Sequence, residues 1–127
     1  MKFFEINPPR LFKAGKDSPI ILKDCAHINL ENDEQVTFKT KMKSEYDILK
    51  KKWGFYATPS LNGRLEKFGL KPVLVRSING KYHVLLVEIG KETCFQKYIA
   101  KEKYRIICWM NDEKILNKIE KIAQDIS

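Results

Sequence analysis

Residues 72–89 read PVLVRSINGKYHVLLVEI and decide the fold class. Two runs rich in Val, Ile and Leu flank Asn79-Gly80, a dipeptide that suits the positive φ angles of a type I′ turn. The pattern therefore predicts an antiparallel hairpin with strands over Pro72–Ile78 and Lys81–Ile89. Because both faces of each strand carry aliphatic side chains, we expect this hairpin at the centre of a sheet.

The chain before this hairpin alternates apolar and polar residues in several short runs, which is typical of half-buried strands. The predicted strands are Lys2–Ile6, Ile20–Leu30, Gln35–Lys41 and Glu45–Lys50. We expect Pro8-Pro9 to end the first strand, because proline lacks the amide donor, and residues through Pro19 to form a surface connection. Asp24 interrupts an apolar row and predicts a bulge or a strand end. The third strand should turn Val36 and Phe38 inward.

Helical spacing predicts three helices in the rest of the chain. A short helix over 61–68 is capped by Ser60 and ends at Gly69. Two amphipathic stripes, separated by the capping pair Asn111-Asp112, indicate C-terminal helices. The first stripe is Phe95, Tyr98, Ile99, Ile106, Trp109 and Met110; the second is Ile115, Leu116, Ile119, Ile122, Ala123 and Ile126.

These elements predict an α+β fold: an antiparallel β-sheet or small open barrel with one short inserted helix and two C-terminal amphipathic helices. The 127 residues suit a single domain, with a β-rich body over 1–90 and a helical segment over 91–127. No apolar run approaches the ~20 residues of a membrane span, and the N-terminal residues do not resemble a signal peptide. We therefore expect a cytoplasmic protein with no membrane partner, and the odd cysteine count of three favours reduced thiols.

The segment Trp53–Arg64 concentrates aromatic and hydrogen-bonding side chains in one connection between a strand and a helix. Its candidate ligand-binding residues are Trp53, Tyr56, Ser60, Asn62 and Arg64. Aromatic rings offer flat faces to a sugar or a base, and the polar groups supply directional hydrogen bonds. In the alternative interpretation Trp53 and Phe55 fill the core, Ser60 caps the helix and Arg64 is a solvated helix residue.

A two-residue turn at Asn79-Gly80 places His83 directly opposite Arg76, so this pair could form one wall of an anion pocket. Cys25 and His27 share a strand face, but zinc requires three or four ligands and a catalytic thiol needs a base held by a third group. We therefore predict no metal, no cofactor and no catalytic residues, and an enzymatic function is the less favoured reading.

The segment W-G-F-Y-A-T-P-S-L-N-G-R-L over 53–65, with Asp24–Phe38 before it and the Phe95–Trp109 stripe after it, resembles a small uncharacterised bacterial protein family. The resemblance covers most of the chain. Its association with surface-polysaccharide and nucleotide-sugar gene neighbourhoods implies a sugar-related ligand or a partner enzyme of such a pathway.

We expect a non-enzymatic binding or accessory protein that recognises a small polar ligand, sugar-like or anionic, or a partner protein. The net charge of +8 and the run Lys50-Lys51-Lys52 leave an RNA-binding small-barrel module as an alternative. Nucleic acid is disfavoured because 20 of the 24 basic residues are lysines, whereas base readout favours arginine. The amphipathic helices leave an oligomeric subunit or stabilising partner as a third possibility.

Overall fold

The computed structural model describes residues 1–15 and 20–126. Those residues form eight strands in three antiparallel sheets and three helices, with no closed barrel, so the predicted α+β class is confirmed. The chain divides into two compact units. Unit 1 comprises Met1–Thr37 and Asp47–Thr58, and unit 2 comprises Phe38–Tyr46 and Pro59–Ser127.

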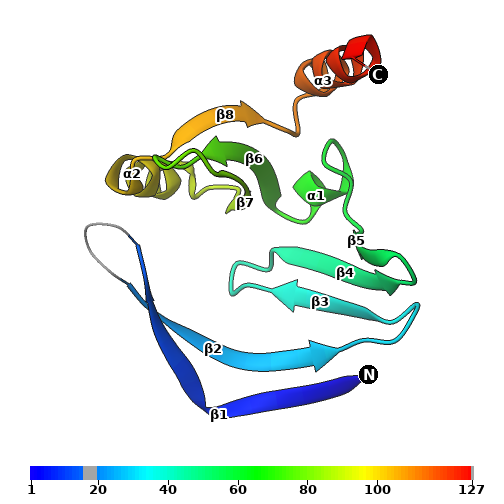
Figure 1. Cartoon of the computed structure of the whole chain (residues 1–127), viewed down its shortest axis with the longest axis vertical. Helices are drawn as coiled ribbons and strands as arrows, with labels where there is room; N and C mark the ends of the chain where they lie inside the picture. The colour runs from blue at the N-terminus through cyan, green and yellow to red at the C-terminus, as the bar shows by residue number, and fades with distance from the viewer. Residues whose placement is uncertain (16–19, 127) are drawn as a thin grey trace. The chain divides into compact units, whose positions relative to one another are not determined.

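In unit 1, β1 (Lys2–Ala14) and β2 (Ile20–Asn29) form a long bent hairpin (Figure 1). The prediction that Pro8-Pro9 ends the first strand is wrong, because β1 continues through the prolines. Pairing of β1 with β2 is interrupted only between Glu5 and Arg10, the stretch that contains both prolines, and resumes at Arg10. The predicted surface connection is therefore strand up to Ala14, and its part over 16–19 lies outside the described residues.

The predicted irregularity at Asp24 is confirmed, because the register shifts there from Glu5↔Ala26 to Arg10↔Asp24. The Asp24 carboxylate accepts from Arg10 Nη2 at 3.3 Å and lies 3.0 Å from His27 Nε2. The hydrogen bond with His27, and then the Arg10 guanidinium, hold the pKa of Asp24 below its usual value. The irregularity thus brings the side chains of Arg10, Asp24 and His27 together on the β1–β2 hairpin.

The second sheet has the strand order β3 (Gln35–Lys39), β4 (Glu45–Lys51), β5 (Gly54–Ala57), and the boundary between the units crosses β3 and β4. Both strands of the predicted hairpin are present. Phe38, predicted to point inward, is exposed. The residues of β5 were assigned by sequence to a connection; they pair with β4 because the two-residue turn Lys52-Trp53 and Gly54, at φ 144°, reverse the chain.

In unit 2, β6 (Leu70–Arg76) lies between β7 (Tyr82–Glu88) and β8 (Arg105–Trp109), and α2 (Glu92–Glu102) covers one face of this sheet (Figure 1). The core consists of Val73, Val75, Val87 and Ile99. The prediction of one helix through Trp109 is wrong. Lys103 takes a left-handed conformation that ends α2, and the residues after it gain β6 as a hydrogen-bonding partner.

The β6–β7 hairpin is present, but its predicted register is wrong. Ser77 N–H donates to the carbonyl of Lys81, so the loop has three residues, 78–80, and not two. Gly80 supplies the positive φ, at 83°, that this loop requires. The expectation that both strands are central is also corrected: β6 is central, whereas β7 is an edge strand.

Two further helices complete unit 2. α1 (Arg64–Lys67) is shorter than predicted, and Gly69 after it has the expected positive φ of 83°. α3 (Glu113–Ile126) begins after Asp112, whose carboxylate accepts from Lys114 N–H at 2.9 Å, which confirms the predicted cap. α3 stands away from the β7-β6-β8 sheet, and none of its described residues is buried (Figure 1).

Candidate functional site

Three aromatic residues in the turn and second strand of the β4–β5 hairpin are exposed. The exposed fraction is 70% for Trp53, 63% for Phe55 and 50% for Tyr56. The interpretation in which Trp53 and Phe55 fill the core is therefore wrong. Large exposed rings grouped at one turn are uncommon on a protein surface and often mark an interaction site.

The register of the hairpin separates these rings onto two faces. Tyr56 pairs with Leu49 and Phe55 pairs with Lys50, so Tyr56 and Phe55 point to opposite sides of the sheet. Trp53 lies in the turn and contacts Tyr56, with ring centroids 6.5 Å apart and planes inclined by 41°. We call the rings of Trp53 and Tyr56 the aromatic platform.

A hollow of about 300 Å³ adjoins Trp53, and its exposed surface is mostly carbon, although four of its five lining residues have polar side chains. It is lined by Asn32, Asp33, Lys51, Lys52 and Trp53. Lys51 Nζ lies 2.6 Å from Asp33 Oδ1, an ion pair that joins the β4–β5 turn to the turn before β3. The hollow therefore brings the amide of Asn32, the carboxylate of Asp33 and two lysine ammonium groups next to the indole of Trp53, all within unit 1.

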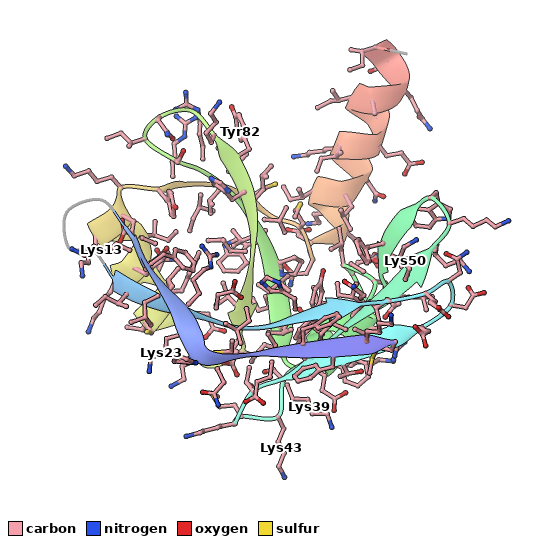
Figure 2. All side chains as sticks on the ribbon, turned by 60° about the horizontal axis from the view of Figure 1, so that its bottom comes forward. Lys13, Lys23, Lys39, Lys43, Lys50 and Tyr82 are labelled. Atoms are coloured by element: carbon pink, nitrogen blue, oxygen red, sulfur yellow. The ribbon has the colours of Figure 1, made fainter. Side chains whose placement is uncertain are left out.

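The lysine run beside the platform is largely engaged within the protein. Lys51 is paired with Asp33, and Lys50 Nζ donates to Asn32 Oδ1 at 3.4 Å and to the carbonyl of Lys51. Figure 2 labels Lys50 on this hairpin. Within the described part of the chain, Lys52 has no ion pair. The run therefore presents less available positive charge than its sequence suggests.

The other half of the predicted segment belongs to unit 2. Ser60 Oγ accepts from the N–H of Arg64 at 2.9 Å, and the Arg64 guanidinium lies 4.9 Å from the centroid of the Phe68 ring. Both are contacts within the α1 region, and Asn62 is exposed in the turn before α1. Ser60 thus accepts the first amide of α1, but the N-cap residue of that helix is Gly63 and not Ser60. The structure does not show Ser60, Asn62 and Arg64 grouped with Trp53 and Tyr56.

The predicted pairing of Arg76 with His83 is wrong. His83 pairs with Val75, and its ring lies 6.2 Å from that of Tyr104, on the face covered by α2. Arg76 lies one position along and points to the opposite face, where its cross-strand partners are Tyr82 and Arg105. The error follows from the loop, because one extra residue moves every partner to the other face.

Sequence reasoning missed a groove in unit 2 that lies between the edge strand β7 and helix α2. Its volume is about 490 Å³. The lining residues are Leu85, Leu86, Val87, Glu88, Lys91, Cys94, Phe95 and Tyr98. We call it the β7–α2 groove. The sequence signal for this surface is the aliphatic run of residues 84–87, which is equally typical of a central strand.

Residues 1–15 and 20–126 contain no cluster of three or more His, Cys, Asp or Glu side chains that could hold a metal ion. None of the helices that the structure describes is long and apolar enough to cross a membrane.

Comparisons with protein-family models, with curated proteins and with solved structures gave no match. The resemblance to an uncharacterised bacterial family therefore stays a prediction. The geometry of the aromatic platform and of the β7–α2 groove is the evidence that bears on function.

Proposed function

We propose that this chain is a non-enzymatic binding protein that recognises a small polar ligand with a flat face, such as a sugar ring, on the aromatic platform. The observation that carries the proposal is the exposed Trp53 ring beside a hollow whose surface is mostly apolar and whose lining residues also include polar side chains. The apolar C–H face of a sugar ring can cover the indole, while its hydroxyl groups exchange hydrogen bonds with Asn32, Asp33 and Lys51.

The charge around the platform supports a neutral or weakly anionic ligand over a nucleic acid. Lys51 is paired with Asp33, and Lys50 is engaged by backbone and amide oxygens. Unit 1 as a whole holds eight Lys and Arg against seven Asp and Glu. Nucleic-acid affinity depends on phosphate neutralisation, which a surface with nearly balanced charge supplies poorly.

RNA binding remains the second candidate because Trp53 and Tyr56 could stack two bases next to Lys52. The two candidates differ in salt dependence. Affinity for a sugar should change little with ionic strength, whereas affinity for single-stranded RNA should fall steeply as salt is added.

The test compares Trp53→Ala with Phe55→Ala, which removes an equally exposed ring from the opposite face of the same hairpin. Each protein is passed over an array of neutral and anionic mono- and oligosaccharides. We expect Trp53→Ala to lower the affinity for the tightest-binding saccharide at least about tenfold, because a stacked ring is typical of binding hot spots. Phe55→Ala should stay within about twofold of the wild type.

Two outcomes would reject the sugar proposal. The wild type could bind no saccharide on the array, or both alanine variants could weaken binding equally. Circular dichroism of each variant establishes that the hairpin is still folded.

A further inference from the structure

The free edge of β7 exposes backbone groups that none of the described strands uses. Ser77–Lys81 and Gly69–Ile89 are hydrogen-bonded pairs, so the odd-numbered residues of β7 direct their N–H and C=O groups toward β6. Tyr82, Val84 and Leu86 direct theirs outward. Among the described strands, β7 has no neighbour on that side.

This edge lacks two of the features by which proteins protect an edge strand, a bulge and a proline. The β6–β7 register runs from Leu70↔Glu88 to Arg76↔Tyr82 without a shift, and β7 contains no proline. Val84 is 55% exposed. The opposite edge differs, because the β6–β8 register shifts between Leu74 and Val75 and Arg105 lies on that edge strand. Of the two edges of the β7-β6-β8 sheet, all of whose strands the structure describes, that of β7 has the uninterrupted register.

The β7–α2 groove adds a place for side chains next to this edge. Leu85 and Val87 lie on the face of β7 that packs toward α2, and Phe95 and Tyr98 approach from the helix. A strand added beside β7 would project alternate side chains over this apolar floor. An exposed sheet edge beside a side-chain groove is the geometry by which domains bind extended peptides.

Charge indicates the kind of partner. Unit 2 holds 16 Lys and Arg against nine Asp and Glu, so it carries almost the whole excess of positive charge. Lys81 precedes β7 and Lys91 follows it, and Lys91 lines the groove. Glu88 is turned to the hydroxyl groups of Thr40 and Ser44, from which its Oε2 accepts at 2.9 and 3.0 Å.

We propose that β7 and the β7–α2 groove bind an extended segment of an acidic partner protein by strand addition. The segment would have apolar residues at alternate positions and carboxylates at its ends, near Lys81 and Lys91. A second copy of the chain fits less well, because two units of the same strong positive charge repel each other. The proposal concerns unit 2 and is independent of the aromatic platform in unit 1.

The test uses the full chain labelled with ¹⁵N and two synthetic peptides. Both peptides have the same core of alternating Val and Thr; one carries Glu at both ends and the other carries Lys. We expect the acidic peptide to shift the amide resonances of Tyr82, Val84 and Leu86 and to protect them from hydrogen exchange. The Lys-ended peptide should bind at least about tenfold more weakly.

Two changes test the mechanism. Val84→Pro removes an outward N–H, which an edge strand tolerates, and should lower affinity for the acidic peptide at least about tenfold. Methylation of alternate backbone nitrogens of the acidic peptide removes the same hydrogen bonds from the ligand, with the protein unchanged, and should have the same effect. This second change keeps the test decisive if Val84→Pro does not fold.

Several results would overturn the proposal. The β7 resonances could remain unchanged at millimolar peptide, the methylated peptide could bind as well as the parent, or the two end charges could give equal affinity. Light scattering can give one further result that would overturn the proposal. If the wild type alone is a dimer and Val84→Pro is a monomer, the occupant of the edge is a second copy and not an acidic partner.

Discussion

At the scale of single residues, local chemistry explains several of the contacts in unit 2. Ser60 accepts the Arg64 amide, as its place before a predicted helix indicates, and Asp112 does the same for α3. Arg76 is different, because its neighbours depend on a loop one residue longer than Asn79-Gly80 predicts. Its cross-strand partner on β8 is Arg105, so two positive charges lie opposite each other.

We expect Arg105→Thr to stabilise the protein by a few tenths of a kcal/mol at low salt, since like charges directly opposite in a sheet are destabilising by roughly 0.2–1 kcal/mol. The measurement is urea unfolding of both proteins. Added sodium chloride should reduce the difference by screening the repulsion in the wild type. If Arg105→Thr were less stable at low salt, the two guanidinium groups would be held apart or compensated by other contacts.

At the scale of elements, the amphipathic pattern predicted helices correctly only where no strand competed for the residues. α2 packs Phe95 and Ile99 on the sheet, whereas Ile106 and Trp109 of the same stripe became part of β8. α3 satisfies the pattern fully but has no buried residue, and Ile122 is 61% exposed. Periodicity therefore identified an apolar face without showing whether that face is covered.

The contrast between the exposed helix α3 and the buried core predicts different effects of mutation on the free energy of unfolding. Ile122→Ala on α3 should change the free energy of unfolding by less than about 0.5 kcal/mol, because the side chain is already largely in water. Val75→Ala in the core should cost about 2–3 kcal/mol, because buried methyl groups and their packing are lost. Chemical denaturation of the two variants measures both values. A large loss for Ile122→Ala would show that the apolar face of α3 is covered in solution.

At the scale of the whole molecule, the charge is divided unevenly between the two units. The net charge of +8 suggests a polyanion-binding protein, but the excess is seven in unit 2 and one in unit 1. The basic surface and the aromatic platform thus belong to different units. The order of charges along the chain does not show this division, because each unit is built from two separate stretches of chain.

We expect the full chain to bind a polyanion column at low salt and to elute at a salt concentration that Trp53→Ala leaves unchanged, because the charge excess belongs to unit 2. Lys91→Glu, which reverses one charge of that unit, should elute at lower salt. If Trp53→Ala lowered the salt concentration of elution, the aromatic platform would take part in polyanion binding, which would favour the RNA alternative.

The sequence by itself determined the fold class, most strand positions, the left-handed Gly69 that follows the short helix, and the cap of α3. These features depend on alternation, helical spacing and turn residues, which act over a few neighbouring positions. Only the tertiary structure decided that β7 is an edge, that residues 105–109 are strand, and that His83 and Arg76 face opposite ways. Each of these depends on which distant segment supplies the hydrogen-bonding partner, and a pattern read along the chain does not contain that information.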